Sequence, residues 1–112
     1  MSDNNLEGSA EYVNPLVDSL ENIFKEMGEF SIHAFPDATS FEHILKLRQE
    51  ALEVLAHPTD KIEYIDCLLA LLAAIYKAGI TYDEMILLLR TKLNINKNRN
   101  WVKQIDGTYQ HS

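Results

Sequence analysis

Four acidic residues form two pairs, one on each side of a His-Pro sequence near the middle of the chain. Glu50 and Glu53 precede Pro58 by eight and five residues, and Glu63 and Asp66 follow it at the same separations. Within each pair the acids are three positions apart, which places them on one face of a helix. Carboxylates crowded together in apolar surroundings need a counter-charge, and a hard divalent cation with oxygen ligands supplies it. The spacing therefore indicates a candidate metal site.

The chemistry of such a site would centre on phosphates. Mg²⁺ is the natural ion, with Mn²⁺ as a substitute, because Mg²⁺ keeps some of its waters and binds phosphate oxygens. Such a site suits the hydrolysis of a phosphoryl or nucleotidyl group, in which a water bound by the metal or held by a carboxylate is the nucleophile. The alternative is a solvated acidic face, since acids three apart on a helix are common. The pattern alone leaves these two interpretations balanced.

A helical hairpin would bring the two pairs together. Thr39 and Glu42 resemble a capping box, which predicts a helix from about 40 to 56. The proline at 58 ends this helix, and Thr59 is expected to cap the next one, which is apolar almost all round and runs to about Ala78, before a glycine. Because short connections join antiparallel neighbours, the acid pairs should lie at matched heights across the hairpin.

Two further helices complete the predicted fold. The first should begin at Asn14-Pro15 and end at Gly28, followed by a loop over residues 30–40. The last should begin at a second capping box, Thr81 with Glu84, and run to about Leu93. Residues 1–13 are expected to be a flexible arm. The sequence thus predicts an all-α, four-helix bundle-like domain over residues 14–112, with a C-terminal extension from about residue 95.

Composition restricts the classes of function. The chain has 112 residues, 46% of them hydrophobic, which suits one domain, and its net charge of -7 disfavours binding to a nucleic-acid backbone. The single cysteine, Cys67, cannot form an intramolecular disulfide, and the four histidines, His111 among them, lack metal-ligand spacing. No leader-like segment and no apolar run of membrane-spanning length is present, so we expect a cytoplasmic protein without a membrane partner.

The ordered motifs resemble a known family. The Glu-x-x-Glu and Glu-x-x-Asp pairs look like the signature of the MazG-like all-α nucleoside triphosphate pyrophosphohydrolases. The sequences HPTDKIEYID at 57–66 and YKAG at 76–79 are similar to the dATP/dGTP pyrophosphohydrolase branch of that family. The same branch carries a K…N..R.W stretch, which this chain matches with Lys92, Asn96, Arg99 and Trp101. The likeness covers about residues 42 to 111.

The resemblance implies an activity and a set of roles. The enzyme would hydrolyse a nucleoside triphosphate, a purine deoxynucleotide above all, between its α- and β-phosphates to give the monophosphate and pyrophosphate. By position, the metal ligands would be Glu50, Glu53, Glu63 and Asp66, with Glu50 or Glu53 also orienting the attacking water. Lys92, Asn96 and Arg99 would meet the phosphates, and Trp101 would stack on the base or simply pack.

Several alternatives stay open. Lys92, Lys97 and Arg99 lie near the end of the last predicted helix, where positive charge interacts favourably with the helix dipole whatever the function. This is the alternative to a role in phosphate binding. Lys46, four positions before Glu50, is equally suited to a salt bridge and to a phosphate contact. The same fold could act on an alarmone or a modified nucleotide, or serve as a non-enzymatic interaction module. Because one helix is apolar all round, the chain should also form a homo-oligomer, a dimer or a tetramer, to cover its apolar surface.

Overall fold

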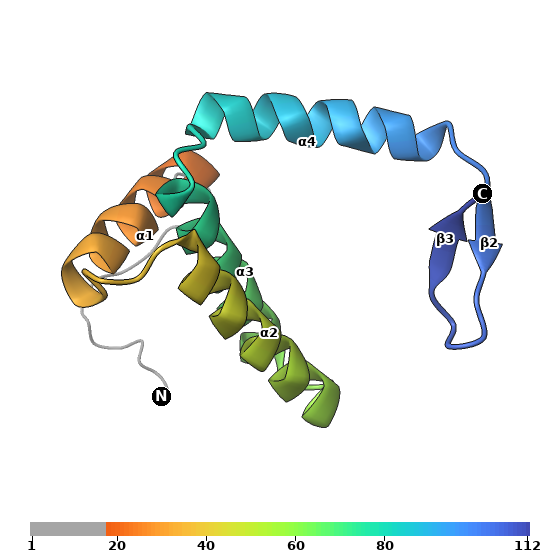
Figure 1. Cartoon of the computed structure of the whole chain (residues 1–112), viewed down its shortest axis with the longest axis horizontal. Helices are drawn as coiled ribbons and strands as arrows, with labels where there is room; N and C mark the ends of the chain where they lie inside the picture. The colour runs from red at the N-terminus through yellow and green to blue at the C-terminus, as the bar shows by residue number, and fades with distance from the viewer. Residues whose placement is uncertain (1–17) are drawn as a thin grey trace. The chain divides into compact units, whose positions relative to one another are not determined.

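The structure is a computed structural model that describes residues 18–112, and these residues form a mostly helical fold with four helices, as the sequence predicts (Figure 1). Their contacts divide into two compact units, one ending at Gly79 and the other spanning Ile80 to Ser112. The elements are α1 (Leu20–Ala34), α2 (Ser40–Ala56) and α3 (Lys61–Lys77) in the first unit, and α4 (Tyr82–Lys97), β2 (Trp101–Lys103) and β3 (Tyr109–His111) in the second. The arm expected over residues 1–13 lies outside the described residues.

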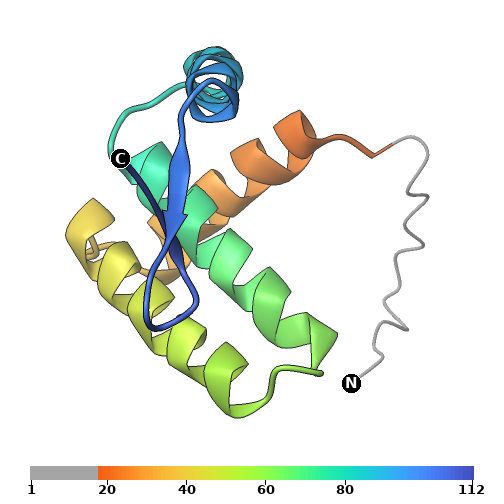
Figure 2. The same cartoon turned by 90° about the vertical axis from the view of Figure 1, so that its right-hand side faces the viewer.

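Helices α2 and α3 form the predicted antiparallel hairpin, and Figure 2 shows them side by side. Helix α2 has the predicted bounds and the predicted capping box, in which Thr39 N–H donates to Glu42 Oε1 at 2.7 Å. The prediction that Thr59 caps α3 is wrong. Asp60 is the cap, and its carboxylate accepts from Ile62 N–H at 3.2 Å, because a turn closed from Asp60 N–H to His57 O places Thr59 before the helix.

Helix α1 differs from its prediction at both ends. It begins after Ser19, whose Oγ accepts from Asn22 N–H at 3.1 Å, and residues 14–17, where the start was expected, lie outside the described residues. It runs through Gly28 to Ala34, so the expected stop at Gly28 is wrong. A Cβ at Gly28 would overlap the ring of Tyr76 on α3. The glycine therefore serves close helix packing rather than helix termination.

The core of the first unit lies where α1 crosses α3. Phe24 of α1 is 2% exposed, and its ring lies 5.5 Å from the ring of Tyr76. The buried residues that α3 contributes are Ala70, Leu72, Ala73 and Ala74. The first half of α3 is only partly covered by the described chain, since Ile62 is 58% exposed. Although α3 is apolar almost all round, the residues that the described chain buries lie in its C-terminal half.

The second unit joins α4 to a small sheet. The capping box of Thr81 and Glu84 is confirmed, but α4 continues four residues beyond the predicted end at Leu93. Two side chains satisfy carbonyls of this last turn, since Asn98 Nδ2 donates to Asn94 O and Trp101 Nε1–H donates to Asn96 O, both at 2.9 Å.

Strands β2 and β3 pair antiparallel, with Trp101 opposite His111. Their connection is a tight turn in which Gly107 has a φ of 92° and Asp106 Oδ1 accepts from Thr108 N–H and Oγ–H, at 3.0 and 2.7 Å. The sequence predicted an extension here but no sheet. Among residues 18–112 no single helix is both long and apolar enough to cross a membrane; α3 and α4 reach that length and composition only as a bent pair.

Candidate metal centre

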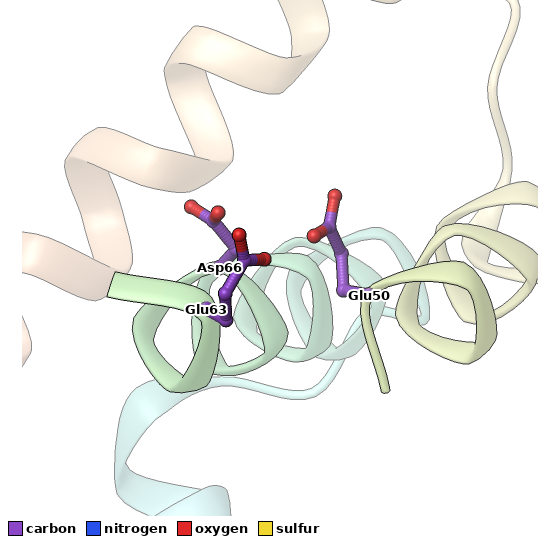
Figure 3. Close-up of side chains that lie close together, drawn as sticks. All are labelled: Glu50, Glu63 and Asp66. Carbon is purple, nitrogen blue, oxygen red and sulfur yellow. The ribbon is translucent and has the colours of Figure 1, made fainter. Parts of the chain in front are cut away.

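Three of the four predicted ligands come together across the helical hairpin. Glu50 extends from α2, and Glu63 and Asp66 extend from α3, each offering a carboxylate oxygen within 4.8 Å of the others. Figure 3 shows that the three carboxylates point to the same side of the hairpin. All three residues are half-buried. The symmetric spacing about Pro58 therefore corresponds to a real convergence of acids from two helices.

Glu53 occupies a different position. It lies one helical turn after Glu50 on α2, is exposed, and is outside the group of three. Its charge nevertheless reaches the group, because it is one of the charges that raise the pKa of Glu63. The role of Glu53 as a fourth ligand or as the residue that orients water stays a prediction.

The group is an acidic cluster whose charge is only partly compensated by Lys46. Burial, followed by the charges of Asp60 and Asp66, raises the pKa of Glu63 above its ordinary value. Burial, followed by the charge of Glu50, also raises the pKa of Asp66, although Lys46 partly opposes this shift. The charged forms of Glu63 and Asp66 are thus disfavoured, and a bound divalent cation would favour them instead.

Asp60 is an acid near the centre that was not among the ligands predicted from the sequence. Its charge raises the pKa of both Glu63 and Asp66, and its carboxylate also caps α3. The signal was present in the sequence, because Asp60, Glu63 and Asp66 continue a single three-residue spacing along the start of α3. The cap function explains why Asp60 sits at the first turn whether or not it serves a metal.

Lys46 forms an ion pair with Glu50, with its Nζ 2.9 Å from Glu50 Oε2. The ammonium side chain is 58% exposed, whereas the Glu50 side chain is 14% exposed. The hydrogen bond to Glu50, together with its charge, raises the pKa of Lys46. Of the two roles considered for Lys46, the structure thus contains the salt bridge, and the phosphate contact stays a prediction.

The donor set fits a hard divalent ion. It consists of carboxylate oxygens held by two packed helices, which is the ligand type that Mg²⁺ and Mn²⁺ prefer. One lysine pairs with one of the acids, so the four acids near the centre, Asp60 included, outnumber this partner. A cation of charge two would compensate most of this excess, and Glu50, Glu63 and Asp66 are the side chains placed to hold it.

The remaining predicted residues belong to the second unit. Lys92 and Asn96 line a shallow pocket of about 480 Å³ along α4, beside Ile86, Leu89, Arg90 and Leu93. Arg99 is half-buried, and Trp101 is 42% exposed. Asn96 Oδ1 is buried without a hydrogen-bond partner, so this side chain offers an acceptor that the described residues do not use.

The helical fold of this chain matches that of a solved enzyme. A solved structure, the cyanophage S-2L MazG-like pyrophosphohydrolase bound to dGDP and three catalytic Mn²⁺ ions per active site, is similar with a TM-score of 0.73 and 25% identity, over 85% of this chain and 98% of that chain. The fold is therefore MazG-like. The family model for dATP/dGTP pyrophosphohydrolase matches residues 23–112, and the chain belongs to that family.

A curated relative supports the same assignment. The dATP/dGTP diphosphohydrolase of Salmonella phage PMBT28 is 33% identical over 94 residues, which cover 83% of this chain. The matched part is 31% of the relative, so this chain spans about a third of that protein's length. The resemblance inferred from the acid pairs and the basic stretch is thus confirmed at the level of the family.

Proposed function

We propose that this protein hydrolyses a purine deoxynucleoside triphosphate to the monophosphate and pyrophosphate in a reaction that depends on Mg²⁺, with Mn²⁺ as a substitute. The observation that carries the proposal is the convergence of Glu50, Glu63 and Asp66 across the hairpin. Membership in the dATP/dGTP pyrophosphohydrolase family, and the dGDP and Mn²⁺ held by the MazG-like neighbour, support the substrate class and the need for a divalent ion.

The carboxylates and the water nucleophile act at the metal end of the substrate. Glu50, Glu63 and Asp66 hold the cation, which when bound polarises phosphate oxygens and water. Glu53 or Glu50 orients the water for attack on the α-phosphate and accepts its proton. Placing a carboxylate beside this water lowers the cost of aligning it, and positioning is, with electrostatic stabilisation, the main source of catalysis in phosphoryl transfer.

The phosphates and the base are bound by residues of the second unit. Between Arg90 and Lys103 the chain has five basic residues and no acidic one, whereas the whole chain is strongly acidic. Lys92 and Arg99 supply positive charge to the polyphosphate, and the planar guanidinium offers paired N–H donors to phosphate oxygens. Asn96 contributes an amide, and Trp101 provides an aromatic face for the base.

Product analysis tests the proposed reaction. With dATP or dGTP and Mg²⁺ or Mn²⁺, we expect the deoxynucleoside monophosphate and pyrophosphate in equal amounts, because attack at the α-phosphate expels the two outer phosphates together. Ion-exchange separation of the products, across a panel that includes pyrimidine, modified and alarmone-type nucleotides, gives the measurement. Diphosphate with orthophosphate would contradict α–β cleavage, and hydrolysis of only a modified nucleotide would contradict the purine substrate.

We also propose that the protein acts as a homo-oligomer. Apolar side chains at the tip of the hairpin are poorly covered, since Leu52, Leu55 and Ile62 are 61%, 76% and 58% exposed. Apolar surface of this extent is typical of an interface between chains. We expect light scattering at micromolar concentration to give a dimer or tetramer, and Leu55→Glu to shift the mass toward that of one chain. A wild-type protein with the mass of a single chain would refute this proposal.

A further inference from the structure

In the second unit, His111 contacts two of the predicted substrate-binding residues, Arg99 and Trp101, although no role was predicted for it from the sequence. Arg99 Nη1 lies 3.3 Å from His111 Nδ1. The ring of Trp101 meets the His111 ring edge-on, with centroids 6.1 Å apart at an angle of 78°. The indole Nε1–H of Trp101 in turn donates to Asn96 O. Asn96, Trp101, His111 and Arg99 are therefore held as one connected group.

The direction of the bond between Arg99 and His111 follows from their chemistry. A guanidinium carries only donors, so His111 Nδ1 must be the acceptor, and the imidazole proton lies on Nε2. Using Nη1 for this bond leaves the other N–H groups of Arg99 free for oxygen acceptors. The histidine thus fixes the arginine without occupying the edge that would bind phosphate.

The sheet explains how His111 reaches Arg99. The two residues are twelve positions apart, and the antiparallel pairing of β2 with β3 returns the chain to the starting point. The return is closed beyond β3, where Ser112 N–H donates to Asn100 O at 3.1 Å. The two strands have three residues each and contribute no buried residue, so hydrophobic burial does not account for the hairpin.

We propose that His111 is a positioning residue that holds the Arg99 guanidinium ready for the nucleotide phosphates, and that the C-terminal hairpin exists to deliver it. This inference rests on the proposed function, in which Arg99 meets the phosphates. An unrestrained arginine loses side-chain entropy when it binds, and a guanidinium fixed in advance loses less. Both residues remain accessible to water, so the gain is that of a single hydrogen bond.

Two substitutions separate the hydrogen bond from the ring contact. His111→Phe keeps a ring beside Trp101 but removes the acceptor, whereas His111→Asn loses the ring but places an amide oxygen near the position of Nδ1. We expect His111→Phe to raise the KM for dATP or dGTP about three- to tenfold with little change in kcat, as the loss of one ground-state hydrogen bond does. His111→Asn should recover most of that loss. Gln110→Ala on the same strand is the matched control.

A double-mutant cycle tests whether His111 acts through Arg99. In an Arg99→Ala background, His111→Phe should add no further increase in KM, since the bond is already absent. Trp101 is the only tryptophan of the chain, so its emission maximum reports whether the hairpin is retained in each variant. If His111→Phe shifts this emission, His111→Asn decides the question: a KM near that of the wild type supports positioning, and one as high as that of Arg99→Ala refutes it.

Failure of the positioning role and failure of the proposed function give different kinetic results. If the wild type hydrolyses purine deoxynucleotides but His111→Phe leaves KM unchanged, or raises it equally in the Arg99→Ala background, the positioning role is wrong and the proposed function stands. If the wild type hydrolyses none of the nucleotides, the proposed function fails, and the inference fails with it.

Discussion

Glu63→Gln is expected to lower the turnover of dATP or dGTP at least about 100-fold, since even residues that only support metal ligands cost 10- to 100-fold when changed. The substitution replaces a carboxylate of the candidate metal centre by an amide of the same shape. One of the three oxygens that lie within 4.8 Å of one another then loses its charge. Pyrophosphate release measured over a range of Mn²⁺ concentrations gives the result.

The matched control for this experiment is Glu26→Gln. Glu26 is an exposed acid of α1 that is not one of the three grouped carboxylates, so its substitution changes the net charge by the same amount without removing a candidate ligand. Its turnover should equal that of the wild type. Thermal melting of both variants without metal establishes that they are folded. A wild-type rate in Glu63→Gln would remove this residue from the mechanism and would weaken the assignment of the whole centre.

Local signals were sufficient to predict α2. A capping box fixes its start, and a proline two residues beyond its end prevents continuation, so both bounds depend on residues within the helix or directly beside it. The same holds for the start of α4 and for the stop of α3 at Gly79, which has a φ of 83°. Ends marked by a capping box, or by a proline or glycine just beyond the helix, could be read directly from the sequence. The single-residue caps Ser19 of α1 and Asp60 of α3 could not, because neighbouring residues are equally suited to cap.

Elements determined by contacts between distant segments could not be predicted from the sequence. Gly28 has the composition of a helix stop, but its place in α1 depends on the ring of Tyr76, which lies 48 positions away in the sequence and in contact in space. The C-terminal hairpin likewise depends on pairs such as Trp101 with His111, and its strands are too short to show alternation. No sequence pattern within either segment predicts these contacts.

The candidate site was predictable because its geometry follows from helical spacing and a short connection. These two features place Glu50 opposite Asp66 and bring Glu63 to the same side. What the spacing could not specify is the orientation of each side chain. Glu53 has the same symmetric placement as Glu63 but is not part of the group of three, and Asp60 contributes charge although its position suggests only a cap.

Asp66→Asn is expected to raise the melting temperature in EDTA by about 2–4 °C while activity disappears. Asp66 is held near Glu50 in a partly buried setting, and burial, followed by the Glu50 charge, raises its pKa. The charged carboxylate therefore destabilises the metal-free fold, and a neutral amide removes that repulsion. If Asp66 were a solvated surface acid, its substitution would change neither the melting temperature nor the activity. A higher melting temperature combined with lost activity therefore distinguishes a metal centre from an acidic face.

The pH dependence of this effect has a definite sign. Because the pKa of Asp66 is raised, the folded state binds its proton more tightly than the unfolded chain does. The destabilisation is fully present above the raised pKa and vanishes as the pH falls toward the ordinary value. Glu42 and Asp106, whose pKa values are lowered by hydrogen bonds from Thr39 and Thr108, act in the opposite direction. The difference between wild type and Asp66→Asn cancels their contribution and should shrink as the pH is lowered.

Divalent metal should reverse the order of stability. A cation that binds only the folded protein raises the melting temperature in proportion to the logarithm of its concentration above Kd, so millimolar Mg²⁺ or Mn²⁺ should stabilise the wild type. Asp66→Asn has lost a ligand and should respond much less, whereas Asp37→Asn, in the exposed loop before α2, should respond as the wild type does. Scanning fluorimetry of the three proteins in EDTA and in metal provides the comparison. Equal metal-induced shifts in wild type and Asp66→Asn would show that Asp66 does not hold the ion, because a ligand cannot be neutralised without loss of binding free energy.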